Sequence, residues 1–251
     1  MRPWYETAFG RDYLERYPHR DEAEAREDVD AIVKLLSPDP AAPLLDLGCG
    51  AGRHLIAFCR AGFEDLVGLD LSEELLEIAR RRLDEAACQT IALHCLDMRR
   101  IPYESFFGTA VSIFTSFGYF EADREDGKVL EAVRSALRPG GRFLLDTMNR
   151  DWTIAHLVAS EEAELPGGRA TVTRAITDDG LRVEKLVRLA DPGTGEDLIR
   201  RESVRMYSAT ELAEMFAEAG FVDVSVFGSL RGEPFDAGAE RTVVVGTKES
   251  T

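Results

Sequence analysis

The sequence predicts an α/β protein with a parallel sheet, flanking helices and an antiparallel β insertion after the fifth strand. Three observations support this fold class. Short apolar runs alternate with helical segments between residues 44 and 149, which is the pattern of βαβ units. A glycine-rich turn, GCGAG, directly follows the first apolar run. After residue 149 the alternation stops, and residues 168–207 read as consecutive strands joined by turn sequences.

Size, composition and charge limit the partners of this chain. With 251 residues, of which 45% are hydrophobic, it can bury one large core plus a small appendage. The formal net charge is −16, from 46 acidic and 30 basic side chains. Such a surface repels phosphate backbones, and the one dense basic cluster, Arg80–Arg82, suits a helix C-terminus. We therefore expect no nucleic-acid partner.

Nothing in the sequence indicates export or membrane insertion. The first 22 residues hold no apolar stretch long enough for a signal peptide, and no run of about 18 apolar residues is present to span a membrane. The four cysteines lack metal-ligand spacing and are expected to be buried, reduced thiols: Cys49, Cys59, Cys88 and Cys95. The four histidines are scattered. The sequence thus predicts a cytoplasmic protein with no membrane contact and no metal site.

The first predicted unit is an N-terminal helical arm over residues 1–40. Val29, Ile32 and Leu36 lie at helical spacing, which predicts a helix over residues 22–36 that the following prolines end. Before this helix, aromatic residues alternate with charged ones: Trp4, Tyr5, Phe9, Tyr13 and Tyr17. The arm must therefore pack its rings onto another surface.

The α/β body follows, over residues 41–149 and 208–251. Gly62 is placed to end its first helix, and Ser72 to cap the second, which has glutamates in its first turn. Apolar runs predict five strands before residue 149, at residues 44–48, 65–70, 90–96, 110–117 and 142–147. Helices are predicted between them, at residues 52–61, from Ser72 onward and at residues 124–137.

An insertion over residues 150–207 interrupts this body. Two turn sequences, DDG and DPGTGE, separate three strand-like stretches, which indicates an antiparallel sheet. Helical sequence resumes at Ser208, which forms a capping box with Glu211. Two final strands, at residues 222–229 and 241–247, complete the main sheet.

The glycine turn is compatible with two ligand classes. A dinucleotide site uses G-x-G-x-x-G and places the pyrophosphate at the helix N-terminus. Here Gly48, Gly50 and Gly52 give G-x-G-x-G, and Arg53 occupies the position of the third dinucleotide glycine. Because a bulky arginine would obstruct close helix–strand packing there, the dinucleotide interpretation is disfavoured. The glycine turn alone does not identify the ligand.

Two aspartates at strand ends narrow the choice. Asp70 ends the second strand, where a carboxylate can accept hydrogen bonds from both hydroxyls of a ribose. Asp97 ends the third strand and precedes Met98, and together they offer adenine an acceptor and an apolar contact. Each aspartate taken singly could equally be a helix cap or a turn residue. Three ligand contacts at the ends of adjacent parallel strands match the usual binding position in open α/β sheets.

Five stretches of the sequence resemble the class I S-adenosylmethionine-dependent methyltransferases. In chain order they are LLDLGCGAGRH, LVGLDLSEELLEIARRR, HCLDMRRIPY, FTSFGYF and LRPGGRFLLD, all within residues 44–149. The resemblance implies a Rossmann-like seven-stranded sheet with one antiparallel strand. It also implies that S-adenosyl-L-methionine lies across the ends of the first strands.

The resemblance assigns cofactor-binding residues by position. The turn from Gly48 to Gly50, with Asp46 beneath it, would hold the methionine part, and Asp70 would bind the ribose. The further contacts it implies are Leu71 beside the adenine, Asp97 and the Met98 backbone at its edge, and Phe114 near the sulfonium. Arg53, just past the glycines, is a hypothetical partner of the methionine carboxylate, and a solvated first-turn arginine is the alternative.

Methyl transfer from a sulfonium requires an aligned nucleophile and exclusion of water. Aromatic faces near the sulfonium stabilise its positive charge, and the candidates are Tyr5, Tyr13, Tyr17, Phe117 and Tyr119. A general base is needed only for a hydroxyl or a protonated amine. The sequence does not identify that base; the candidates are His19, Tyr119 and His156, and for each of them a packing or surface position is the alternative.

The arm and the insertion are both expected to cover the active site. The arm resembles the N-terminal lid of small-molecule methyltransferases and would fold over the cofactor, with Tyr13, His19 or Arg20 touching it; packing on an outer face is the alternative. The insertion lies beside the expected acceptor pocket and would form a substrate lid. We expect an enzyme that transfers a methyl group from S-adenosylmethionine to a nitrogen or oxygen of a small molecule by in-line displacement. The alternatives are a non-catalytic cofactor-binding module and a protein or RNA methyltransferase.

Overall fold

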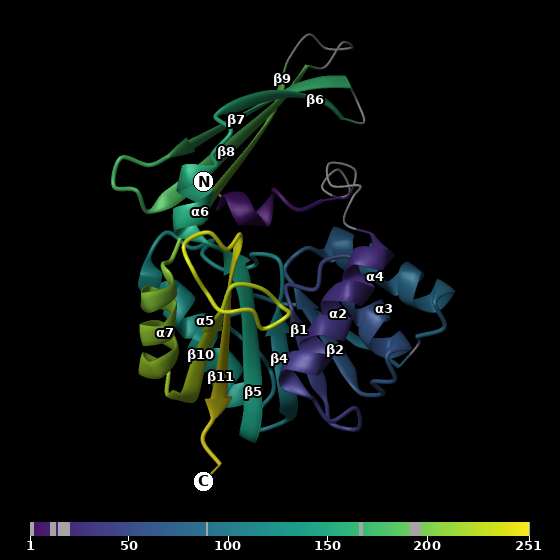
Figure 1. The fold of residues 1–251 in the computed structure, drawn as a ribbon. Helices are drawn as coiled ribbons and strands as arrows, with labels where there is room; N and C mark the ends of the chain where they lie inside the picture. The colour runs from purple at the N-terminus through teal and green to yellow at the C-terminus, as the bar shows by residue number, and fades with distance from the viewer. Residues whose placement is uncertain are drawn as a thin grey trace.

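Two β-sheets organise the chain, the larger with seven strands and the smaller with four. Figure 1 shows the smaller sheet above the edge at which the parallel strands of the larger sheet end, with the N-terminal 3₁₀ helix η1 (Trp4–Glu6) between them. This is a computed structural model, and it describes residues 3–10, 14, 21–88, 90–165, 168–190 and 197–250.

The large sheet has the strand order β10-β11-β5-β4-β1-β2-β3. The strand β11 pairs antiparallel with both of its neighbours, whereas the pairs among the first five strands are parallel. The strands are β1 (Leu44–Leu47), β2 (Leu66–Asp70), β3 (Ala92–Cys95), β4 (Phe107–Ser112), β5 (Leu137–Met148), β10 (Phe221–Phe227) and β11 (Arg241–Lys248). The expected Rossmann-like seven-stranded sheet is confirmed.

Helices cover both faces of this sheet and create two cores. The helices are α2 (Glu22–Leu36), α3 (Arg53–Arg60), α4 (Glu73–Glu85), α5 (Asp123–Ala136) and α7 (Ala209–Glu218). Successive strand residues point to opposite faces, so Leu44 packs in one core with α2 and α3, while Leu45 packs in the other with α5 and α7. Within the described ranges, no helix is long and apolar enough to cross a membrane.

The predicted helix caps are confirmed. The Ser72 hydroxyl accepts a hydrogen bond from the Leu75 N–H at the start of α4. Ser208 and Glu211 form the reciprocal capping box at the start of α7. Each cap satisfies backbone donors that the first helical turn leaves free, which explains why the helices begin where they do.

The small sheet is antiparallel, with the order β6-β7-β8-β9, and it follows β5 as expected. Its strands are β6 (Ser160–Leu165), β7 (Gly168–Ile176), β8 (Arg182–Ala190) and β9 (Asp197–Arg205), and the short helix α6 (Arg150–Ala155) precedes them. The sequence did not predict β6 or α6. The β6 sequence, SEEAEL, is acidic because β6 is an exposed edge strand, so it lacks the apolar alternation that reveals a strand.

The fourth strand of the large sheet was placed wrongly from the sequence. Residues 110–117 were expected to be a strand, but β4 ends at Ser112. The chain turns at Phe114 and Thr115, which both have positive φ, and the aromatic residues beyond them pack against other elements. An aromatic-rich run therefore resembled a strand without being one.

The expectation of four reduced, buried cysteines is wrong for three of them. Cys59 in α3 and Cys88 after α4 form a disulfide, with their Cα atoms 6.3 Å apart, because these two helices pack side by side. Cys95 is a free thiol at the surface, and only Cys49 is free and buried as expected.

Candidate active site

The turn after β1 depends on glycines in conformations that other residues rarely adopt. Gly48 and Gly52 both have a φ of 79°, in the left-handed region. A Cβ added to Gly48 would lie 2.7 Å from the Ser116 side chain, so the turn approaches the loop after β4 too closely for a larger residue. The helix α3 begins at Arg53, and its unpaired first-turn N–H groups therefore lie beside this turn.

Asp70, the last residue of β2, is bonded to that turn. Its Oδ2 accepts a hydrogen bond from the Gly50 N–H at 2.8 Å, and its Oδ1 accepts one from the Ser72 N–H at 2.8 Å. Burial raises the pKa of Asp70, and the two backbone donors partly offset this rise. The Asp70 carboxylate thus ties the end of β2 to the turn after β1.

Asp97 follows β3 and is held by Arg99. The guanidinium donates to both carboxylate oxygens, with 3.0 Å from Nε to Oδ1 and 2.5 Å from Nη2 to Oδ2. Burial raises the pKa of Asp97, but the hydrogen bonds from Arg99 outweigh it, and the net shift is downward. Arg99 also pairs with Glu125 at 2.6 Å. Asp97 is therefore an ionised and oriented acceptor beside Met98.

Asp46 lies beneath the glycine turn and is 1% exposed. Among the residues that the structure describes, its Oδ2 has no hydrogen-bond partner. Burial raises the pKa of Asp46 to about 6, although the charge of nearby His54 lowers it. An unsatisfied, buried carboxylate oxygen favours a positive charge close to the turn.

A cavity of about 460 Å³ opens where β1, β2 and β3 end. Its volume is within the range of small-molecule sites. Eight residues expected to bind the cofactor line it: Gly48, Gly50, Arg53, Asp70, Leu71, Asp97, Met98 and Phe114. Asp46 is not part of the lining, and Tyr13 lies outside the described residues. The structure therefore brings together, at one cavity, residues that are spread over about seventy positions of the sequence.

The turn after β4 contains two strained residues, of which Phe114 lines the cavity. Phe114 has a φ of 66° and Thr115 a φ of 61°, which are unfavourable for bulky and β-branched side chains. The Phe114 N–H donates to Asp146 Oδ2 at 2.8 Å, and the Thr115 N–H to the Asp146 carbonyl at 3.0 Å. The Asp146 carboxylate also forms a bidentate pair with Arg241, at 2.9 and 2.8 Å. These bonds hold the turn that presents Phe114 to the cavity.

Arg53 lines the cavity but is not a solvated arginine. Its Nη1 lies 2.6 Å from Glu24 Oε2 of α2, and its side chain is 14% exposed. The guanidinium carbon lies 5.7 Å from the centre of the Phe114 ring. The alternative of a solvated first-turn residue is therefore wrong, because α2 packs against α3 and covers this position.

Aromatic side chains of the N-terminal segment form part of the cavity wall. The ring of Trp4 lies 5.0 Å from that of Tyr119, and the ring of Tyr5 lies 5.3 Å from that of Phe120. Phe9 stacks on Tyr119 at 5.5 Å. Because Tyr5, Phe9, Tyr119 and Phe120 all line the cavity, its wall here is made by two segments far apart in the sequence.

Several lining residues were not singled out from the sequence as site residues. They are Phe9, Leu14, Asp21, Glu22, Cys49, Ala51, His54, Leu69, Leu75, Arg82, Glu85, Leu96, Ile113, Ser116 and Phe120. The alternation of aromatic and charged residues near the N-terminus was the available signal, but it does not say where the segment docks. Ser72 supplies that contact, since its hydroxyl donates to the Phe9 carbonyl at 2.7 Å.

The candidates for a general base have different positions. Tyr119 lines the cavity. His156, at the end of α6, is exposed, stacks on Trp152 at 4.4 Å and is not part of the lining. His19 lies outside the described residues. Phe117, one of the aromatic candidates for the sulfonium, is buried in the core and packs on Tyr207 instead of facing the cavity.

Comparison with known proteins gives the family. Residues 44–141 match a family described as "Methyltransferase domain". The chain is 32% identical over 222 residues to the dTDP-3-amino-3,4,6-trideoxy-alpha-D-glucopyranose N,N-dimethyltransferase of Streptomyces venezuelae, and the match covers 87% of each chain. It is 29% identical over 239 residues to the dTDP-3-amino-3,6-dideoxy-alpha-D-glucopyranose N,N-dimethyltransferase of Streptomyces fradiae, covering 89% of this chain and 86% of that relative.

Solved structures share the whole architecture. The crystal structure of Streptomyces venezuelae DesVI matches with a TM-score of 0.66 and 28% identity, over 93% of this chain and 95% of that one. The CcbJ methyltransferase of Streptomyces caelestis matches with a TM-score of 0.76, over 97% of this chain and 99% of that one, and at 17% identity this likeness concerns the fold alone. Since a relative above 30% identity is matched along most of both chains, this chain belongs to the class I S-adenosylmethionine-dependent methyltransferases, which are enzymes that take their methyl group from S-adenosylmethionine.

Proposed function

We propose that this enzyme transfers a methyl group from S-adenosylmethionine to the amine nitrogen of a small molecule, and that the acceptor is an amino sugar. The observation that carries the proposal is the match to an N,N-dimethyltransferase of a nucleotide-linked amino sugar along 87% of both chains. A match of that length includes the β6–β9 insertion as well as the cofactor-binding body. A second relative with the same kind of acceptor in its name supports the same chemistry.

The cavity fits S-adenosylmethionine, and we propose a place for each of its parts. The turn from Gly48 to Gly50 takes the methionine part; the buried, unsatisfied Asp46 carboxylate beneath the turn attracts its ammonium, and Arg53 in the lining meets its carboxylate. Asp70 binds the ribose hydroxyls. The other proposed contacts are Leu71 on the adenine ring, Asp97 and the Met98 backbone at the adenine edge, Phe114 near the sulfonium and Tyr13 from the arm. The narrow approach at Gly48, where a Cβ has no room, supports close backbone contact with a ligand.

When bound, S-adenosylmethionine supplies an activated methyl group, so the protein must mainly align the acceptor nitrogen and exclude water. Phe114 and Tyr119 present aromatic faces to the cavity, and such faces stabilise a positive charge. Phe9 and Tyr5 close the cavity against solvent. A neutral amine needs no base, and for a protonated amine Tyr119 is the candidate that lines the cavity.

We propose that two segments act as lids. The arm over residues 1–40 closes the cofactor cavity through aromatic residues, of which Trp4, Tyr5 and Phe9 contact Tyr119 and Phe120. The insertion over residues 150–207 covers the acceptor, because its sheet lies above the ends of the parallel strands (Figure 1). The body, over residues 41–149 and 208–251, binds the cofactor.

A methyl-transfer assay with matched acceptors tests the proposed function. The purified enzyme is incubated with S-adenosylmethionine and a nucleotide-linked amino sugar, and the product mass is measured. We expect the addition of one or two methyl groups. The control acceptor is the same sugar with a hydroxyl in place of the amine, and it should remain unmodified. Methylation of the hydroxyl sugar, or of protein or RNA instead of any amino sugar, would contradict the proposal.

We also propose that the enzyme works in the cytoplasm without a nucleic-acid or membrane partner. Its net charge of −16 supports this, because phosphate backbones and anionic membrane surfaces repel an acidic protein. The Cys59–Cys88 disulfide argues the other way, since such bonds are rare in a reducing cytosol. Cell fractionation with compartment markers decides between them, and recovery outside the cytoplasmic fraction would contradict the proposal.

A further inference from the structure

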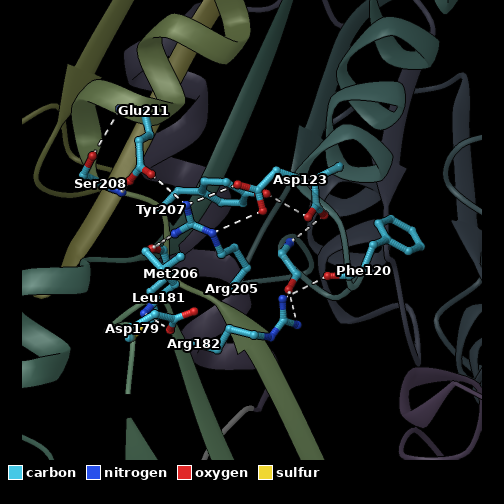
Figure 2. Close-up of polar contacts among 12 residues, drawn as sticks. Phe120, Asp123, Asp179, Leu181, Arg182, Arg205, Met206, Tyr207, Ser208 and Glu211 are labelled. Carbon is cyan, nitrogen blue, oxygen red and sulfur yellow. Dashed lines mark hydrogen bonds and ion pairs between the residues drawn. The ribbon is translucent and has the colours of Figure 1, made fainter. Parts of the chain in front are cut away.

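The loop between β4 and α5 joins the small sheet to the cofactor cavity. Its residues Gly118, Tyr119 and Phe120 lie where β8 and β9 reach the body of the protein (Figure 2). The side chains of Tyr119 and Phe120 line the cavity, while the carbonyls of Gly118 and Phe120 in the same loop accept hydrogen bonds from the small sheet. The contacts of the small sheet with this loop therefore affect the position of the cavity wall.

Two arginines of the small sheet hold the backbone of this loop. The Arg182 guanidinium donates to the Phe120 carbonyl at 3.0 Å and to the Gly118 carbonyl at 3.4 Å, as Figure 2 shows. It also donates to Ser203 of β9, at 2.9 Å to Oγ and 2.7 Å to the carbonyl, which fixes the direction of the side chain. The Arg205 N–H donates to the Gly118 carbonyl at 2.7 Å.

Gly118 allows this close approach. Its φ is 87°, and a Cβ at this position would lie 2.4 Å from the Arg205 carbonyl oxygen. Its N–H donates to Asp126 Oδ1 at 3.1 Å. The N–H and the carbonyl of Gly118 are thus both bonded, the first to α5 and the second to the small sheet.

The Arg205 side chain is anchored in the body of the protein. It is 5% exposed and pairs with Asp123 at 3.2 Å and with Glu211 at 2.7 Å. Its guanidinium carbon lies 4.4 Å from the centre of the Tyr207 ring, and the Tyr207 hydroxyl donates to buried Asp126 at 2.9 Å. Figure 2 shows Asp123, Tyr207 and Glu211 gathered around the Arg205 side chain. The end of β9 is therefore rigidly attached to α5 and α7.

The other side of the loop carries the N-terminal aromatic residues. Tyr119 contacts Trp4 and Phe9, and Phe120 contacts Tyr5. A displacement of the loop backbone would move the surface on which this aromatic closure packs. The loop thus contacts the small sheet on one side and the N-terminal aromatic residues beside the cavity on the other.

We propose that Arg182 and Arg205 are positioning residues: they hold the Gly118–Phe120 loop so that Tyr119 and Phe120 close the cofactor cavity, and the small sheet thereby sets cofactor affinity. This inference rests on the proposed place of S-adenosylmethionine in the cavity. It assigns the small sheet a role in cofactor binding in addition to covering the acceptor. Neither arginine lines the cavity, so the effect is transmitted through the loop.

Arg182→Met is the test variant, because it removes both bonds to the loop and keeps the bulk of the side chain. Arg188→Met is the matched control: Arg188 lies on the same face of β8, and its side chain is 55% exposed and pairs with Asp197 at 3.7 Å. The dissociation constant of S-adenosylmethionine is measured by calorimetry well below the melting temperature. We expect Arg182→Met to bind roughly tenfold more weakly and Arg188→Met to bind as the wild type does.

Hydrogen exchange provides a second readout that needs no ligand. In Arg182→Met, amides of residues 113–121 should exchange roughly tenfold faster than in the wild type, while those of β1 and β5 should not change. Arg182→Lys, which restores one donor, should recover part of the affinity and of the protection.

The outcomes separate this inference from the proposed function. If the wild type binds S-adenosylmethionine and Arg182→Met binds it equally well, the inference is overturned and the proposed function stands, whatever the change in melting temperature. Equal weakening by Arg188→Met overturns it as well. If the folded wild type does not bind S-adenosylmethionine, both proposals fail.

Discussion

Single residues at this site are held in unfavourable conformations by specific partners. Positive φ at Phe114 and Thr115 costs on the order of 1–3 kcal/mol per residue. Asp146 offsets this cost with two hydrogen bonds, one from each N–H, and Arg241 fixes the Asp146 carboxylate by a bidentate pair. The result is a fixed aromatic face at the cavity, which a relaxed loop would not provide.

Replacing Arg53 tests its pairing with the methionine carboxylate. We expect Arg53→Met to weaken S-adenosylmethionine binding by roughly tenfold, since one charge-assisted hydrogen bond is lost, and calorimetry measures this. Arg80→Met of α4 is the control, because Arg80 is 46% exposed, pairs with Glu73 at 2.7 Å and does not line the cavity. Unchanged affinity in folded Arg53→Met rules the pairing out.

The buried Asp126 carboxyl should give stability a distinctive pH dependence. Burial raises its pKa from 3.8 to about 7, although the hydrogen bond from Tyr207 lowers it. Between these values the folded state binds a proton that the unfolded state has released, so the free energy of unfolding falls as the pH rises, by at most about 1.4 kcal/mol per pH unit. Asp126→Asn remains neutral and should lose this component of the fall.

Urea unfolding at several pH values between 4 and 8 measures the effect. The free energy of unfolding of Asp126→Asn minus that of the wild type should be larger at pH 8 than at pH 5. Only the wild type has a buried charge at the higher pH, and this charge destabilises it. Asp178→Asn, at an exposed turn position, serves as the control and should follow the wild type. Parallel pH profiles for the wild type and Asp126→Asn would show that the Asp126 pKa is not raised.

At the scale of elements, the sequence predicted those that carry a strong local signal. The parallel strands contain short apolar runs such as LVGL and FLL, and Ser72 and Ser208 mark the starts of their helices because capping depends on nearby residues. The sequence failed where distant contacts decide the structure. The turn at Phe114 depends on Asp146, thirty-two positions away, and the acidic β6 depends on pairing with β7.

Among the site residues, too, those set by the fold class were predicted and those set by distant contacts were not. The Gly48–Gly50 turn, Asp70 and Asp97 meet at one cavity because the ends of parallel strands meet at one edge, which is a property of the fold class. The closure by Phe9 and Phe120 was not predicted, since nothing local in either segment says that they meet. The Cys59–Cys88 pairing likewise depends on how α3 and α4 pack.

The disulfide should stabilise the helix layer that contains α3 and α4. Cys59 and Cys88 are separated by 29 positions, and closing a loop of this length contributes about 3–4 kcal/mol through the entropy of the unfolded chain. Reduction should lower the melting temperature, which calorimetry with and without dithiothreitol measures. The Cys59→Ser/Cys88→Ser variant should melt like the reduced wild type and show no further change on reduction. A reduced wild type as stable as the oxidised one would contradict this.

At the scale of the molecule, the cavity is built by three parts of the chain. The large sheet supplies the strand ends and the glycine turn, the N-terminal segment adds Tyr5 and Phe9 to the lining, and the small sheet bonds to the loop on which that segment packs (Figure 1). Arg53 lines the part of the cavity where we place the methionine carboxylate, and Glu24 of α2 holds its guanidinium there at 2.6 Å.

Calorimetric titration of the purified protein with S-adenosylmethionine tests whether the cavity at the strand ends binds the cofactor. We predict that the wild type binds one molecule per chain, and that Asp70→Asn, which loses a ribose acceptor, binds roughly tenfold more weakly or worse. Asp65→Asn, an exposed position just before the opposite end of β2, should bind as the wild type does. A folded wild type that does not bind S-adenosylmethionine, or an Asp70→Asn variant with unchanged affinity, would contradict it.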